Sequence, residues 1–181
     1  MAEIDEFAAG LLEEAKRFLE RAQDTTDAIA INANLHAALM IGFGALEAHI
    51  NAVCEEVSVR PELSIHEAAF ILEKDVGLNN AGEFVTKNVL KMTRIEDRIL
   101  FLHRRFSQAP LDKSQTWWGA LMGALDLRNK LTHPKDATPI TVTAIASALQ
   151  AIIDALNALY QAVYNRPFPS INRGLNSLLS F

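Results

Sequence analysis

Long stretches in which apolar residues recur every three or four positions are the feature that most constrains this chain. That spacing places the apolar side chains on one face of an α-helix. It is clear over residues 4–24 and 140–164, and residues 27–58 follow it while being apolar on more than one side. Ala and Leu are abundant, with only 8 Gly and 6 Pro among 181 residues, so the composition also favours an all-helical protein.

Shorter elements are predicted between these long helices. Helices are expected over 64–75, 94–107 and 115–132, and loops over 76–84, 107–115 and 134–139. The sequence "SIHE" at 64–67 matches a capping box, which marks the start of a helix. Ser114 is the expected N-cap of the helix over 115–132. Residues 85–93 fit either a helical turn or a short strand.

The predicted fold class is all-α, an antiparallel bundle of four main helices plus short helices. Residues 1–165 form a single helical domain, and residues 166–181 form a C-terminal tail that docks on this domain or is exchanged with a partner. The helices over 27–58 and 140–164 are apolar on several sides. A small bundle cannot hide so much apolar surface alone, so we expect a homodimer.

The N-terminal sequence and the single cysteine indicate a compartment. "MAEIDEFAAG" is acidic, whereas a secretory leader begins with basic residues. The longest apolar run, residues 35–46, is shorter than the roughly 20 residues of a membrane-spanning helix. One thiol, Cys54, cannot form an internal disulfide. We therefore expect a soluble cytoplasmic protein that does not enter a membrane.

Charge is unevenly distributed along the chain. The formal net charge is −5, which alone argues against a nucleic-acid binder. Residues 87–135, however, hold ten basic and four acidic residues, so this segment carries +6 and the remainder −11. A basic block of this kind suits an anionic ligand, although a solvated helix face has the same composition.

The basic block ends in "LRNKLTHP", residues 127–134. Asn129 and His133 are four residues apart, so they differ by only about 40° around a helix and share a face. Arg128 lies about 100° further round. Pro134 disfavours helical geometry at His133, so the imidazole falls where the helix ends. Together the three side chains form a corner that can hold an anion beside a titratable ring.

The spacing of Arg and His is not informative alone, because it recurs in "RILFLH" (98–103) and nearly so in "RPELSIH" (60–66). The first is apolar between its ends, and His103 is expected at a helix edge with one hydrogen-bond partner. The second is broken by Pro61 and Ser64. Only residues 127–134 form a continuous unit with a polar residue after the arginine.

Such a corner supports metal-independent cleavage of RNA. A histidine can accept or donate a proton at neutral pH, and a guanidinium stabilises charge that develops on a phosphate. Asn129 could fix the imidazole tautomer or position the phosphate. The other interpretation is a plain helix C-terminus, where cationic residues offset the helix dipole and proline commonly follows.

The motif also resembles that of a known family. "LRNKLTHP", preceded by "WWGALMGAL", is similar to the signature of the HEPN superfamily (higher eukaryote and prokaryote nucleotide-binding domains), and "GFGALEAHINAV" (42–53) looks like the second helix of such domains. The resemblance implies a HEPN-like bundle. Many members are metal-independent endoribonucleases that act as symmetric dimers, often toxins with a cognate antitoxin or antiviral effectors. Arg128, Asn129 and His133 match the motif positions; other members are nucleotide-binding or scaffold modules.

Three further residues are assigned to the candidate site. Lys130 and Lys135 are expected to contact the substrate. Glu47 falls between Phe43, Leu46 and Ile50, where a carboxylate is costly unless paired. It forms a structural salt bridge, lies as a carboxylate at the helix edge, or makes a contact that orients Arg128 or His133. The remaining histidines and aromatic residues of note are interpreted as structural: His36, His49, Trp117 and Trp118.

The combined prediction is a dimeric endoribonuclease that uses Arg128, Asn129 and His133 of two protomers on RNA. The chain has no Cys/His cluster and no Gly-rich phosphate loop, so neither a metal nor another cofactor is expected. The alternative is a non-catalytic HEPN-like helical module that binds a partner or a nucleotide.

Overall fold

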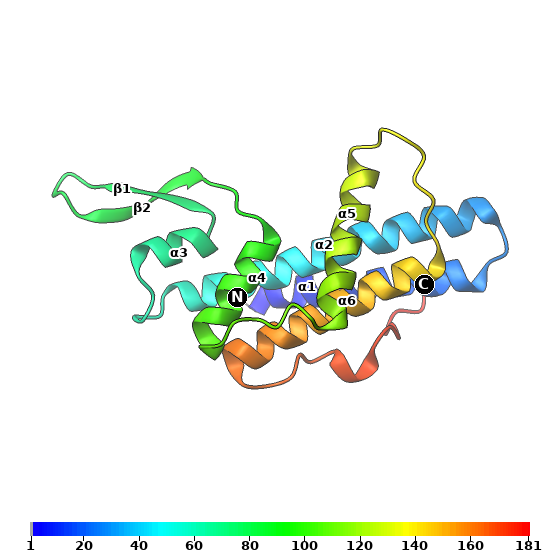
Figure 1. The fold of residues 1–181 in the computed structure, drawn as a ribbon. Helices are drawn as coiled ribbons and strands as arrows, with labels where there is room; N and C mark the ends of the chain where they lie inside the picture. Colours follow the sequence, from blue (N-terminus) through cyan, green and yellow to red (C-terminus); the bar gives the residue numbers. More distant parts are fainter. Residues whose placement is uncertain (1) are drawn as a thin grey trace.

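The computed structural model describes residues 2–181, with side chains from Ile4 onwards, and shows a mostly helical chain with one small sheet (Figure 1). The prediction of a helical protein is confirmed at this level. The elements are α1 (Ala2–Asp24), α2 (Ala28–Ser58), α3 (Ile65–Ile71), β1 (Lys74–Leu78), β2 (Phe84–Leu90), α4 (Ile95–Ser107), α5 (Thr116–Thr132), α6 (Val142–Tyr164) and the 3-10 turn η1 (Ile171–Arg173).

The core forms where α2 packs against α1 and α6. α1 and α2 are joined by three residues and lie side by side (Figure 1). The carboxylate of Asp27 accepts a hydrogen bond from the Ile29 N–H at 3.0 Å and so caps α2. At Gly42 the backbone of α2 approaches α6 so closely that a Cβ there would collide with Leu149. The small residues of α2 therefore permit close helix packing, as their positions predict.

The two helices that are apolar on several sides are covered in part by other helices of the same chain. α6 buries eleven residues and α2 buries thirteen, mostly apolar. Their apolar character is thus explained in part by neighbouring helices of the same protomer. By length and composition alone, both α2 and α6 would also suffice to cross a membrane.

The sheet is an antiparallel hairpin of β1 and β2 that extends away from the helices (Figure 1). The predicted loop over 76–84 was therefore wrong in part, and the strand alternative for 85–93 was the correct one. The turn is built by Asn79, whose side-chain oxygen accepts hydrogen bonds from the Ala81 and Glu83 N–H groups. Gly82 takes a positive φ of 78°. Asn and Gly in these roles are typical turn residues.

Two predicted helix boundaries differ from the structure. The capping box of α3 is present, but the helix ends at Ile71 instead of residue 75. Glu73 adopts a left-handed φ of 54°, which turns the chain from α3 into β1. Its carboxylate accepts a hydrogen bond from the Thr93 N–H. Ser114 does not cap α5. It bonds instead to the Asp112 carboxylate, and Gln115 occupies the N-cap.

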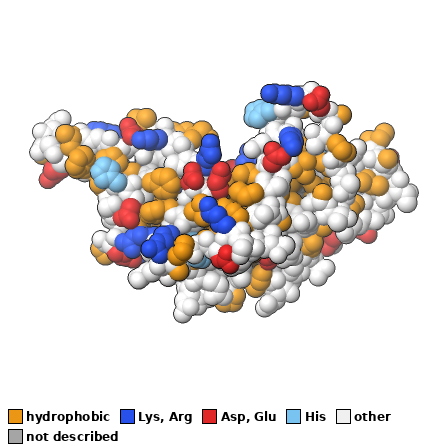
Figure 2. All heavy atoms as spheres, viewed as in Figure 1, with side chains coloured by type: hydrophobic (Ala, Val, Ile, Leu, Met, Phe, Trp, Pro, Cys, Tyr) orange, Lys and Arg blue, Asp and Glu red, His pale blue; other side chains and the backbone are white. Residues whose placement is uncertain are grey.

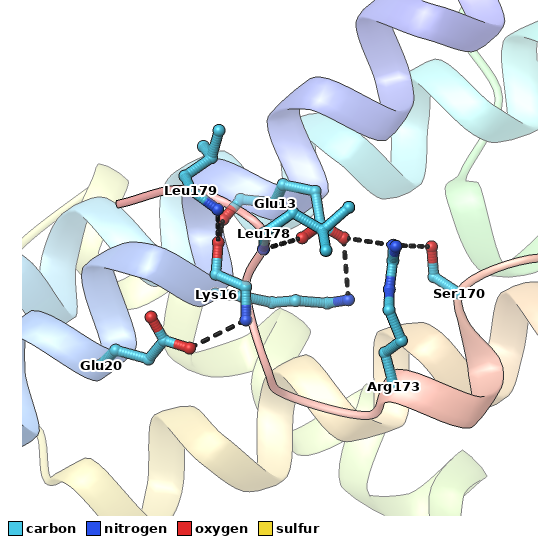
Figure 3. Close-up of polar contacts among 8 residues, drawn as sticks. Glu13, Lys16, Glu20, Ser170, Arg173, Leu178 and Leu179 are labelled. Atoms are coloured by element: carbon cyan, nitrogen blue, oxygen red, sulfur yellow. Dashed lines mark hydrogen bonds and ion pairs between the residues drawn. The ribbon is translucent and has the colours of Figure 1, made fainter. Parts of the chain in front are cut away.

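Residues 166–181 lie against α1 and α6 of the same chain, anchored by the carboxylate of Glu13 (Figure 3). One oxygen accepts hydrogen bonds from Lys16 Nζ at 3.1 Å and Arg173 Nη2 at 2.7 Å; the other accepts one from the Leu178 N–H at 2.7 Å. Lys16 is fully buried. Within the described residues, Glu13 is the only hydrogen-bond partner of its ammonium group.

Removing the Glu13 carboxylate should destabilise the protein strongly. Glu13→Ala leaves the buried Lys16 charge unpaired, and losses of about 3–5 kcal/mol in the free energy of unfolding are typical of such changes. The double variant Glu13→Leu/Lys16→Met should recover much of this loss, and Glu14→Ala is the control. Urea denaturation measures all three. A double variant as unstable as Glu13→Ala would show that the buried charge is not the cause.

His49 on α2 is a buried imidazole within the aromatic part of the core. Its ring meets that of Phe168 edge-on at 5.1 Å and that of Tyr160 at 6.5 Å. Within the described part of the chain, neither ring nitrogen has a hydrogen-bond partner. Burial lowers the pKa of His49 from 6.5 to about 4. The ring is therefore neutral in the folded protein at neutral pH.

Acid should destabilise the fold through His49. The pKa of His49 is lower in the folded than in the unfolded chain, so protonation of its ring favours unfolding. The free energy of unfolding should therefore be unaffected by His49 above pH 6.5 and should fall by roughly 3 kcal/mol as the pH decreases from 6.5 to 4. His49→Leu should flatten this part of the profile of unfolding free energy against pH. The exposed His36→Gln should leave it unchanged. Parallel profiles for the wild type and His49→Leu would disprove the assignment.

Candidate functional site

The last turn of α5 presents the Arg/Asn/His motif. Trp118, Leu121 and Ala124 bury one face of this helix, and its far end projects from the body of the protein (Figure 1). The helix ends at Thr132, as Pro134 predicts. His133 is the C-cap residue, with φ −127° and ψ 63°, and its N–H donates to the Asn129 carbonyl at 3.0 Å. The imidazole is exposed at the point where the helix stops.

Arg128 is held in place by two residues of α2. Its Nη2 donates to Glu47 Oε1 at 2.9 Å, and its guanidinium lies over the Phe43 ring at 5.3 Å. Its Nε is buried and has no hydrogen-bond partner among the described residues. A charge-assisted hydrogen bond and a cation–π contact together restrict the orientation of the guanidinium. The cation is thus positioned before any ligand binds.

Glu47 lies at the surface and contacts Arg128, one of the two residues that the sequence analysis suggested it would orient. Its side chain is half exposed and forms an ion pair with Arg128, which agrees with the predicted salt bridge at the edge of the helix. An α-helix turns by about 100° per residue, which carries Glu47 away from the buried Phe43 and Leu46. From there the carboxylate reaches Arg128 across the gap between α2 and α5.

Asn129 and His133 share a cavity at the end of α5, of about 610 Å³, which Lys130 and Lys135 also line. Asp136 is the acidic residue on its rim. Lys130 Nζ lies 2.6 Å from Asp126 Oδ2 in an exposed ion pair. The two predicted substrate-contacting lysines are therefore beside the imidazole.

Arg128 lines a different cavity, and Asn129 borders both. Five residues along a helix amount to about 140° of rotation beyond a full turn, so Arg128 and His133 point in different directions. The structure therefore places His133 on one side of Asn129, in the cavity at the end of α5. It places Arg128 and Glu47 on the other side, in the second cavity. One protomer does not direct Arg128 and His133 into one cavity.

The cavity that contains Arg128 is a groove of about 640 Å³ between α2, α5 and the segment that connects β2 to α4. It lies in the hollow between the hairpin and the free end of α5, where basic and acidic side chains occur side by side (Figure 2). Three arginines and three glutamates line it: Arg94, Arg98, Arg128, Glu47, Glu73 and Glu96. We call this cavity the Arg/Glu groove. Its formal charges cancel.

Arg98 anchors the floor of the Arg/Glu groove, and sequence reasoning did not assign it to a site. It is 5% exposed, and its Nη2 donates to Asn51 Oδ1 at 2.7 Å while its Nη1 lies 3.5 Å from Glu73 Oε2. Thr93 donates to the other oxygen of Glu73. The available signal was that Arg98 is spaced by three or four residues from Ile95 and Leu102 and therefore shares their face of the helix, where a charge must find buried partners.

The other Arg–His pairs do not form comparable units. His103 is partly exposed on α4, as predicted, but its Nδ1 lies 3.3 Å from two groups, the Ala109 carbonyl oxygen and Ser107 Oγ, where one partner was expected. His66 is in the first turn of α3, against the Phe84 ring. Trp118 belongs to the core, consistent with a packing role. Over residues 2–181, no cluster of His, Cys, Asp and Glu side chains is arranged to hold a metal ion.

Comparison with known proteins adds no relative. No protein-family model, curated protein or solved structure matches this chain.

Proposed function

We propose that this protein is a metal-independent endoribonuclease of HEPN type, a cytoplasmic effector of toxin or antiviral-defence function. Arg128, Asn129 and His133 of two protomers are its catalytic residues, and RNA is its substrate. The observation that carries the proposal is the arrangement around Arg128, whose guanidinium is fixed by Glu47 and Phe43 while the His133 imidazole stays exposed five residues later. The four main helices of the proposed bundle are α1, α2, α5 and α6.

The proposed reaction needs no group beyond these side chains and the RNA. The ribose 2′-oxygen attacks the neighbouring phosphorus, its proton passes to an imidazole, and the bond from phosphorus to the 5′-oxygen breaks. A proton delivered to that 5′-oxygen completes the cleavage and leaves a 2′,3′-cyclic phosphate. Arg128 stabilises the extra negative charge on the phosphate oxygens. One imidazole can perform both proton transfers in turn, or two can share them.

A second protomer is part of the proposal. Arg128 and His133 line different cavities of one chain, and pairing of two protomers is the arrangement that we propose to place a guanidinium and an imidazole on one phosphate. The free end of α5 projects from the body, where another α5 end can reach it (Figure 1). A twofold axis close to Asn129 would bring both motifs together.

The same features also permit a non-catalytic role. Arg128 is already paired with Glu47, and a cationic side chain at a helix C-terminus is favourable without any catalysis. In this second candidate function, the motif is a binding surface for a protein or a nucleotide. An antitoxin would be a partner under the first function alone.

Substitution of the motif should abolish RNA cleavage. We expect His133→Ala to lower the cleavage rate by about 10²-fold or more, as loss of a general acid or base does, and Arg128→Ala by a similar factor. His36→Ala, an exposed histidine on α2, is the matched control and should be unaffected. Cleavage of labelled RNA is measured in EDTA, with circular dichroism as the check on folding.

Two further readouts belong to the same experiment. The products should carry 2′,3′-cyclic phosphate ends, and specific activity should fall when the protein is diluted below the dissociation constant of its dimer. Equal cleavage by wild type and a folded His133→Ala variant would rule out the nuclease and leave the binding module.

A further inference from the structure

We propose that the Arg/Glu groove binds a guanine base of the RNA, in the nucleotide next to the cleaved bond. This inference rests on the proposed nuclease function. Phosphate-binding sites carry net positive charge, whereas the six charged residues of this groove cancel. A volume of about 640 Å³ is typical of small-molecule sites. The lining thus suits a neutral ligand rich in hydrogen-bonding groups, and nucleobases are the neutral part of RNA.

Some of the polar groups in the Arg/Glu groove are already committed. Both oxygens of Glu73 are occupied, one by Thr93 and the other by Arg98. The side-chain oxygen of Asn51, Oδ1, accepts a hydrogen bond from Arg98. These groups hold the floor in a fixed shape. Asn51 also lines the groove, and its side-chain amide N–H groups have no hydrogen-bond partner among the described residues.

Glu96 and Arg94 are the groups with free capacity. The closest ion-pair contact of Glu96 is a 4.0 Å approach of Arg94 Nη1 to Oε1, although its side chain is only 23% exposed. The Arg94 side chain is 80% exposed. At 4.0 Å the pair makes no hydrogen bond, so the carboxylate can accept from one edge of a ligand while the guanidinium donates to the neighbouring edge.

Guanine is the base that matches a carboxylate and a guanidinium together. Its N1–H and N2–H groups are adjacent donors that one carboxylate accepts side by side, and its O6 and N7 acceptors match the fork of an arginine. No other RNA base has two adjacent donors on one edge and two acceptors on another. Apolar atoms of Met92, Ile95 and Leu125 line the same groove and can cover the face of the ring.

The position of the Arg/Glu groove connects it to the catalytic residues. Arg128 lines it, and Asn129 borders both this groove and the cavity that holds His133. A base in the groove therefore places its own phosphate close to the end of α5. Lys135 supplies positive charge on that side, where Lys130 is paired with Asp126.

Binding of short RNAs tests the inference without relying on catalysis. The probes are the pentanucleotides UUGUU, UUAUU, UUCUU and UUUUU, measured by fluorescence anisotropy on the uncleaving His133→Ala variant. UUGUU should bind roughly tenfold more tightly than the others, the scale of one bidentate base contact. Adding Glu96→Gln should remove the preference. Asp97→Asn is the matched control, because it removes a charge from the same first turn of α4 outside the groove.

The outcomes separate this inference from the proposed function. Equal or absent binding of all four probes, or loss of the preference in Asp97→Asn as well, overturns the guanine site even if the wild type cleaves RNA. Guanine-selective binding that depends on Glu96 supports the site, and it does so even if the wild type fails to cleave RNA. In the latter case only the nuclease is overturned.

Discussion

The close packing of α2 against α6 is the constraint on which the candidate site depends. At Gly42 the Leu149 side chain of α6 packs directly on the backbone of α2, and this restricts how α2 is rotated in the core. With that rotation set, Phe43 lies inside and Glu47 emerges beside α5, where each contacts Arg128. One helix therefore provides the core and also the two groups that orient the cation of the site. The site is positioned by packing on a rigid element and not by a loop.

Electrostatics divides the surface near the end of α5 into two parts. On one side of Asn129 the arginines face glutamates, and the charges cancel. On the other side Lys130, His133 and Lys135 share a cavity with Asp136, and Lys130 is also paired with Asp126. Asn129 therefore separates a groove of arginine and glutamate side chains from a cavity that holds the exposed imidazole.

The features that could be predicted from the sequence are those that depend on residues close together along the chain. Helical periodicity located the long helices, and Pro134 located the end of α5 beside His133. The hairpin was missed in part because Asn79 and Gly82 were taken only as a loop, although such residues also close tight hairpins. The cluster of Arg98, Asn51 and Glu73 lay beyond local reasoning, because its members come from three elements that meet only in the folded chain.

The anchoring of the tail has a consequence for how the protein is made on the ribosome. Glu13 and Lys16 are synthesised early, but Arg173 and Leu178, which complete the contacts of Glu13, follow 160 and 165 residues after Glu13. The pairing of α1 with α2 can begin during translation, whereas the full set of contacts around the Lys16 ammonium must wait until residues 170–178 have emerged from the ribosome and docked.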